Sequence, residues 1–295
     1  MTALLAKRAI KRTAGITSVV LRRATRPPSG PSACLLVYHR VSSVRVSESR
    51  LDDWNVTPSS VERQVAALVE SAELVFVRDL PGRLTTWRAG AKPLACLTFD
   101  DGYQNFHDNV LPILETYGAK ATVFVVSGFV GSTAPMPFDR WGMRHAADTP
   151  PGAWRSLSWQ ALERCARSGL VEIGGHSHRH ANAAVTPASD VVEEAGRCRH
   201  TLRERLGPDH AVSYAYPYGS SRLGQVTDGY VAAVKAAGFQ VAVTTNLGLA
   251  TPESDRYQLP RVEVFRSDGP SVVRAKVGGS LAPFYVTDRL RRARR

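Results

Sequence analysis

The chain has 295 residues, of which 43% are hydrophobic and 22% are charged, so it is long enough to bury a sizeable core and has an ordinary globular composition. Its formal net charge is +12. Seven basic residues and no acidic residue lie in residues 1–30, and five arginines and one aspartate lie in residues 288–295. The body between these segments is close to neutral, which argues against a basic nucleic-acid-binding groove, and we expect no specific nucleic-acid partner.

Residues 1–30 alternate basic pairs with apolar residues. Their longest apolar stretch, Ala14 to Leu21, is interrupted by Gly, Thr and Ser, so it predicts neither a membrane-spanning helix nor the core of a signal peptide. Two interpretations stay open: a basic amphipathic helix that contacts an anionic membrane surface, or a disordered leader and linker. We expect a cytoplasmic, membrane-peripheral location, with export to the cell envelope or secretion as the alternative.

Residues 31–287 alternate short apolar runs with amphipathic stretches, which predicts a single α/β domain. The apolar runs predict strands at Ala33–Tyr38, Leu94–Phe99, Ala121–Val126, Leu170–Ile173, Val212–Tyr216, Phe239–Thr244 and Leu259–Val264. Caps and periodicity predict helices that start at Thr57-Pro58 and that cover Phe106–Tyr117, Ser158–Arg167, Thr186–Leu206 and Thr227–Ala237. About seven strands in β-α order favour one barrel of parallel strands, followed by a basic tail at residues 288–295.

Residues 131–156 show no clean period and are rich in Pro, Gly, Met and Trp. They predict an inserted loop over one end of the fold, where residues that shape a substrate site often lie.

The four cysteines are far apart and form no Cys-x-x-Cys pair. Because Cys34 and Cys96 lie within predicted strands, we expect them to be small buried apolar residues, which favours a reducing compartment.

Two adjacent carboxylates, Asp100 and Asp101, follow the predicted strand Leu94–Phe99 directly. In α/β folds, ligands bind at the carboxyl ends of the strands. Neighbouring carboxylates repel each other, and a bound cation is a usual way to keep both ionised. One of the two could instead cap the following helix, but a cap needs a single Asp.

A second chemical segment, Gly175-His176-Ser177-His178-Arg179-His180, follows another predicted strand. If the chain makes a helical turn here, His176 and His180 face the same way and can share one metal ion, while His178 points elsewhere. Two imidazoles and one carboxylate leave an open position, as in catalytic zinc sites. The alternative is a solvated polar loop.

A third segment, Tyr216-Pro217-Tyr218-Gly219, combines a residue of fixed φ with a glycine that permits a turn. This geometry can aim the backbone N–H of Tyr218 at a fixed point, as an oxyanion hole requires. The alternative is an aromatic turn that packs on the core.

Together, Thr98-Phe99-Asp100-Asp101-Gly102, the histidine segment and Tyr216-Pro217-Tyr218-Gly219 resemble the polysaccharide deacetylase (NodB-homology) family, carbohydrate esterase family 4. The resemblance covers roughly residues 32–268. It implies a distorted (β/α) barrel and metal-dependent removal of N-acetyl groups from amino sugars.

The resemblance also implies a role for each site residue. Asp100 would be the general base, and Asp101, His176 and His180 would hold one divalent ion, with zinc as the first candidate and cobalt, nickel, manganese or iron as alternatives. Tyr218 would donate its backbone N–H to the oxyanion. The residues expected to contact substrate are Tyr103, Tyr216 and Pro217.

The sequence departs from the family pattern in two places. Many relatives have an arginine two residues before the proline, where this chain has Ala215, so Arg261 could supply the guanidinium that orients the base. Many relatives also have a late Leu-x-His that supplies the general acid, and this chain has no histidine after His210. Val37-Tyr38-His39-Arg40 resembles the poly-N-acetylglucosamine deacetylase branch, which suggests His39 as the acid.

The expected substrate is an N-acetylated glycan or a lipid-linked amino sugar. Three alternatives compete with this hypothesis. His176-x-His178 has the form of the metal pair of amidohydrolases, but that pair normally lies on the first barrel strand. A non-catalytic glycan-binding barrel would keep sugar affinity without turnover. Nucleic-acid binding would depend on the two basic tails, so their removal should abolish it.

Overall fold

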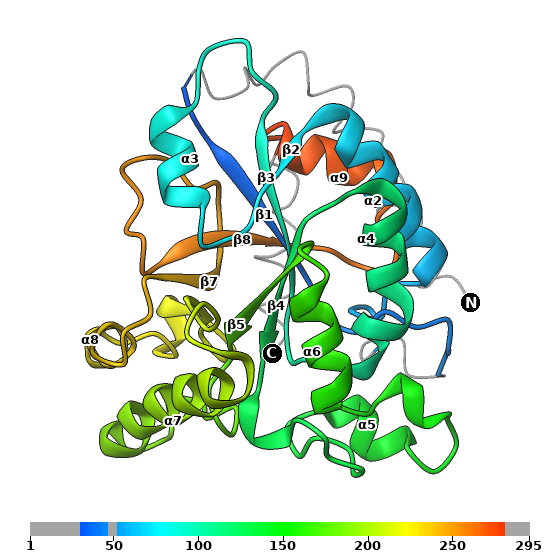
Figure 1. Cartoon of the computed structure of the whole chain (residues 1–295), viewed down its shortest axis with the longest axis vertical. Helices are drawn as coiled ribbons and strands as arrows, with labels where there is room; N and C mark the ends of the chain where they lie inside the picture. The colour runs from blue at the N-terminus through cyan, green and yellow to red at the C-terminus, as the bar shows by residue number, and fades with distance from the viewer. Residues whose placement is uncertain (1–29, 47–51, 281–295) are drawn as a thin grey trace, which may run out of the picture.

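The computed structural model describes residues 30–46 and 52–280 (Figure 1). The predictions for the basic leader and for the tail at 288–295 therefore fall on residues outside the described ranges and stay predictions. Within residues 30–46 and 52–280, no helix is both long enough and apolar enough to cross a membrane.

Seven parallel strands form a closed barrel, as the sequence predicted. Their order is β1-β8-β7-β6-β5-β4-β3, and direct pairing of β1 with β3 closes the ring. The barrel strands are β1 (Ala33–Tyr38), β3 (Leu94–Phe99), β4 (Ala121–Val125), β5 (Val171–Gly175), β6 (Ser213–Ala215), β7 (Val241–Leu247) and β8 (Leu259–Glu263). A short strand, β2 (Glu73–Leu74), pairs with the start of β3 and was not predicted.

Helices surround the barrel on the outside (Figure 1). The described helices are α2 (Pro58–Ser71), α3 (Leu80–Thr86), α4 (Leu111–Tyr117), α5 (Arg140–His145), α6 (Trp159–Arg167), α7 (Ala188–Leu206), α8 (Asp228–Ala236) and α9 (Pro270–Val277). Their starts follow the predicted caps: the Thr57 side chain accepts a hydrogen bond from Ser60 N at 3.2 Å, and Ser158 accepts one from Ala161 N at 3.1 Å.

Four regions differ from the sequence expectation. The helix predicted over residues 106–117 begins as a π-helix, Phe106–Val110, and continues as α4. The segment 131–156, expected to be a loop, contains α5 and a short 3₁₀ turn, Pro151–Ala153. Helices α3 and α9 were missed because they are only 7 and 8 residues long, too short to show a clear period.

Side chains on most barrel strands alternate between two apolar cores. Leu36 and Leu97 pack outward with the surrounding helices, whereas Leu35 and Cys96 belong to the second core, together with Leu80 of α3. All four cysteines are buried and free, as expected for Cys34 and Cys96. Because all seven barrel strands are parallel, their carboxyl ends open at the same mouth, and the three chemical segments lie there.

Candidate active site

The carboxylates that follow β3 occupy different environments. Asp100 continues the strand, and its N–H donates to Tyr38 O at 2.9 Å. Asp101 turns the chain with a φ of 72°, a left-handed conformation that non-glycine residues rarely adopt. Gly102 follows with a φ of 74° and lies against Val125, where a Cβ would come within 3.2 Å of the valine side chain. This turn separates the carboxylates, so that each can meet different partners.

Asp101 meets the two predicted histidines. The Nε2 atoms of His176 and His180 each lie 3.5 Å from Asp101 Oδ1, and one ligand atom from each of the three residues fits within 4.8 Å of the others. Burial would raise the pKa of Asp101, but its close contacts with the two imidazoles lower the pKa well below the usual value. A buried carboxylate and two imidazole nitrogens that converge on one point fit a divalent metal ion.

The route of the chain between the histidines differs from the expected helical turn. Ser177 and His180 have φ values of 62° and 63°, and Ser177 Oγ accepts a hydrogen bond from His180 N at 2.7 Å. This tight polar turn brings His180 back beside His176. His178 points elsewhere, as expected, and its Nδ1 lies 2.9 Å from Ser127 Oγ.

The orientation of His176 favours metal binding. Its Nδ1 lies 2.8 Å from the carbonyl oxygen of Ala215 on β6, and only a protonated nitrogen can donate to a carbonyl. In its neutral form the ring then carries its lone pair on Nε2, the nitrogen that faces Asp101. A hydrogen bond from the other ring nitrogen to a backbone carbonyl fixes the tautomer and ring orientation of metal-binding histidines.

Asp100 is held by Arg261 from β8, the residue proposed to replace the arginine missing at position 215. The two guanidinium nitrogens donate to the two carboxylate oxygens, each at 2.7 Å, and Arg261 is 1% exposed. Arg261 also donates to Thr98 Oγ1 at 3.1 Å and to Thr244 O at 2.9 Å. Burial would raise the pKa of Asp100, but the charge and hydrogen bonds of Arg261 outweigh that effect and lower it. Asp100 is therefore ionised and oriented, as a general base must be.

His39 lies beside the base. Pairing of Tyr38 with Phe99 places His39 and Asp100 one residue beyond the ends of adjacent strands. The His39 ring is half-buried and is among the groups that lower the pKa of Asp100 and Asp101, and its Nδ1 is buried without a hydrogen-bond partner in the described part of the chain. This position allows His39 to exchange a proton with a group held at the mouth.

Tyr218 forms the rim of the site. It has a φ of 60°, its side chain is exposed, and its ring meets the edge of His180 at a centroid distance of 4.8 Å. Thr245 on β7 fixes this turn: its N–H donates to Gly219 O at 2.8 Å and its hydroxyl donates to Tyr218 O at 2.7 Å. The Tyr218 N–H makes no hydrogen bond to another described residue, so it can donate one to an oxyanion.

The three residues expected to contact substrate, Tyr103, Tyr216 and Pro217, are all buried. Tyr216 is 0% exposed and its hydroxyl donates to Tyr257 O at 3.0 Å. Tyr103 is 4% exposed and packs under the guanidinium of Arg40. Pro217 is buried. Side-chain alternation explains why Tyr216 is buried: Tyr214 and Tyr216 both face the outer core, whereas Ala215 faces inward.

Phe138 belongs to the site but was missed in the sequence. Its ring stacks on His180 at a centroid distance of 3.8 Å with an interplanar angle of 12°. It lies within residues 131–156, which were expected to cover one end of the barrel, but nothing in an irregular segment indicates which aromatic residue reaches the histidine.

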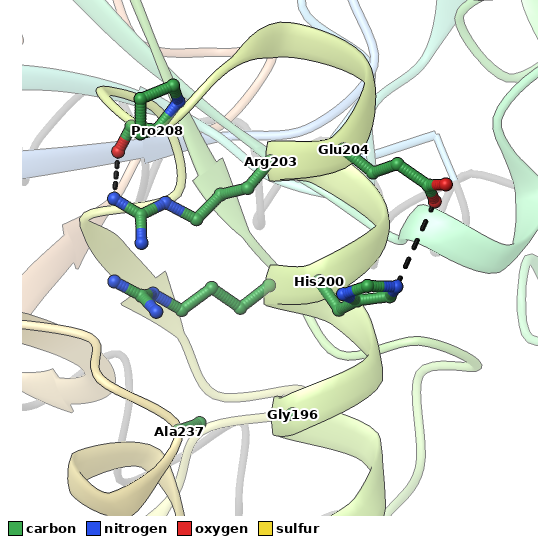
Figure 2. Close-up of a pocket in the computed structure, with 7 residues that line it drawn as sticks. Gly196, His200, Arg203, Glu204, Pro208 and Ala237 are labelled. Carbon is green, nitrogen blue, oxygen red and sulfur yellow. Dashed lines mark hydrogen bonds and ion pairs between the residues drawn. The ribbon is translucent and has the colours of Figure 1, made fainter.

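A separate groove of about 510 Å³ lies away from these residues, along α7 (Figure 2). It is lined by Gly196, Arg199, His200, Arg203, Glu204, Pro208 and Ala237. Figure 2 shows Arg203 reaching the carbonyl of Pro208, just past the end of α7, and His200 facing Glu204 at 3.9 Å. These contacts lie within the last turns of α7 and just past its end, and the groove includes none of the residues at the barrel mouth.

Comparisons with known proteins agree with this arrangement. The poly-β-1,6-N-acetyl-D-glucosamine N-deacetylase of Staphylococcus epidermidis is 24% identical over 256 residues, which cover 79% of each chain. The Bacillus subtilis protein YxkH, a putative polysaccharide deacetylase, is 25% identical over 232 residues, covering 78% of this chain and 70% of the relative.

Solved structures show the same fold. The Streptococcus pyogenes deacetylase PplD, in complex with acetate, superposes with a TM-score of 0.67 at 19% identity, covering 83% of this chain and 98% of PplD. IcaB from Ammonifex degensii superposes with a TM-score of 0.66 at 22% identity, covering 85% of this chain and 99% of IcaB. The family model for polysaccharide deacetylases matches residues 88–242, which include the carboxylates, both histidines and the Tyr218 turn. The chain therefore belongs to the polysaccharide deacetylase family.

Proposed function

We propose that this protein is a metal-dependent N-deacetylase that hydrolyses the acetamido groups of amino sugars in a glycan. The observation that carries the proposal is the meeting of Asp101, His176 and His180 beside a second carboxylate, Asp100, that Arg261 holds ionised. Staphylococcal relatives named as poly-β-1,6-N-acetyl-D-glucosamine N-deacetylases support a β-linked N-acetylglucosamine polymer as the substrate.

In this reaction water adds to the amide carbonyl, the C–N bond breaks, and the products are acetate and a free amine. Asp101, His176 and His180 would hold a divalent ion, which when bound polarises the carbonyl and lowers the pKa of water. Asp100 takes the proton from the attacking water, since its carboxylate is ionised and fixed by Arg261. The Tyr218 N–H stabilises the oxyanion, and His39 gives a proton to the departing amine.

The experiment is mass spectrometry of acetylated glucosamine oligomers, free and lipid-linked, after incubation with metal-loaded protein. We expect loss of acetyl groups and release of acetate. Asp100→Asn should lower kcat by orders of magnitude while the metal stays bound, because Asp100 is not a ligand. If this variant instead loses the metal and regains its rate when the metal is resupplied, the assignment of the two carboxylates is wrong.

The role of His39 needs its own variant. His39→Asn should lower kcat more than KM, since protonation of the leaving amine belongs to the transition state. His200→Asn, at an exposed histidine of α7, is the matched control and should behave as wild type. Full turnover by His39→Asn would remove His39 from the mechanism, and glycan binding without acetate release by the wild type would favour a non-catalytic barrel.

A further inference from the structure

The two histidines of the candidate metal site are held in different ways. His176 has the usual support, because its Nδ1 donates to the carbonyl of Ala215 at 2.8 Å. His180 lacks this support: its Nδ1 is buried and has no hydrogen-bond partner among residues 30–46 and 52–280. A hydrogen bond therefore does not explain how the ring of His180 stays aimed at Asp101.

Aromatic packing holds the His180 ring instead. Phe138 lies nearly parallel to the imidazole, with a centroid distance of 3.8 Å and an angle of 12°, so it covers one face of the ring. Tyr218 meets the ring at 4.8 Å and 66°, which is an edge contact. The side chain of His180 is 8% exposed as a result. A flat neighbour at this distance restricts rotation of the imidazole about its Cβ–Cγ bond.

The position of Phe138 is itself fixed by buried contacts. The next residue, Asp139, forms an ion pair with Arg40, which follows β1 and His39. Arg40 also donates to Ala153 O at 2.6 Å, and its guanidinium lies between the rings of Tyr103 and Trp141, at 4.5 and 4.2 Å from their centroids. The segment that carries Phe138 is thus attached to the barrel at the mouth.

We propose that Phe138 is a positioning residue for the metal ligand His180, and that its stacking does for His180 what the Ala215 carbonyl does for His176. The inference rests on the proposed metal dependence. Without the Phe138 ring, His180 can rotate away from Asp101 and water can reach its covered face. Loss of a supporting contact around a metal ligand typically lowers affinity 10- to 100-fold, so Phe138→Ala should weaken metal binding about tenfold or more.

The test is a metal titration of the full chain after removal of bound metal with a chelator. Co²⁺ is the probe, because its visible absorption reports coordination geometry, and competition with a chromophoric chelator gives the Kd for Zn²⁺. Phe138→Ala removes the ring, Phe138→Leu keeps apolar bulk without a flat face, and Phe138→Tyr keeps the flat face. Met143→Ala, at an exposed residue of α5 in the same segment, is the matched control.

The expected result is a loss of affinity in Phe138→Ala and Phe138→Leu, faster release of the metal to chelator and an altered Co²⁺ spectrum, with Phe138→Tyr and Met143→Ala close to wild type. Phe138→Ala that binds metal within twofold of wild type would overturn the inference. An equal loss in Met143→Ala would also overturn it, since the effect would then reflect a loosened segment. If the wild type itself binds no metal, the proposed function fails, which is a distinguishable outcome.

Discussion

The ion pair between Arg261 and Asp100 gives a quantitative prediction. Arg261→Met keeps most of the side-chain length but removes two charged hydrogen bonds of 2.7 Å from a carboxylate that is 3% exposed. Breaking one partner of a buried ion pair costs about 3–5 kcal/mol, because the remaining charge stays buried without compensation. We expect a loss of stability of this size at pH 7, measured by urea unfolding of the metal-free protein.

The same variant should change the pH dependence of stability. In the wild type, Arg261 lowers the pKa of Asp100. The stabilisation from this ion pair is therefore present above the pKa of Asp100 in the unfolded chain, about 3.9, and is lost as the pH falls through its lower pKa in the folded protein. In Arg261→Met, the strongest influence that lowers the pKa of Asp100 is gone, so burial raises this pKa relative to the wild type. The charged carboxylate then destabilises the folded variant. The difference in the free energy of unfolding between variant and wild type should therefore grow as the pH rises from about 4 to 8.

A surface ion pair provides the matched control. Arg164 pairs with Glu115, and their side chains are 48% and 40% exposed. Arg164→Met should cost at most about 1 kcal/mol, with little dependence on pH, since exposed pairs contribute little. The reasoning is refuted if Arg261→Met unfolds at the same urea concentration as Arg164→Met, or if its stability difference from wild type does not change with pH.

Three further predictions concern other residues. Tyr216→Phe should lose about 1 kcal/mol in thermal unfolding with unchanged KM, because it removes one hydrogen bond from a fully buried side chain to Tyr257 O; a raised KM would contradict the buried placement. Burial raises the pKa of Glu172, although Ser213 and Thr122 donate hydrogen bonds to its carboxylate. Its contribution to stability is therefore greatest below the pKa of the unfolded chain, about 4.3, and is lost as the pH rises through the higher pKa of the folded protein. Glu172→Gln should therefore gain stability relative to wild type between about pH 4 and 8 in urea unfolding, and a flat difference would refute this. Gly219→Ala should lower kcat and stability together, because a Cβ would lie 2.9 Å from Thr245 N at a φ of 65°; wild-type kinetics would show that the turn tolerates change.

The sequence predicted the barrel and much of the site because both depend on local patterns. Short apolar runs identify parallel strands buried on both faces, and polar residues directly after them, such as Asp101 and His176, must lie at the same mouth. The absence of arginine at position 215 directed attention to Arg261, which the structure places on Asp100. The shared mouth follows from strand direction and residue type, whereas the role of Arg261 came from the resemblance to the polysaccharide deacetylase family.

Side-chain direction and irregular backbone were harder to predict. The spacing of His176 and His180 suggested a helical turn, but positive φ values at Ser177 and His180 bring the rings together in another way. Tyr216 was expected to contact substrate, but it continues the alternation of β6, and its side chain lies in the core. Phe138 approaches His180 through tertiary contacts that no periodic pattern encodes.

The account depends most on one ion held by Asp101, His176 and His180. The most direct measurement is an anomalous-difference map from crystals of protein loaded with Zn²⁺ or Co²⁺. We predict a single strong peak within coordination distance, about 2.0–2.2 Å, of one oxygen of Asp101 and the Nε2 atoms of His176 and His180, with Asp100 still bound to Arg261. A peak on Asp100 in place of Asp101, or full occupancy elsewhere with these three side chains empty, would contradict the account.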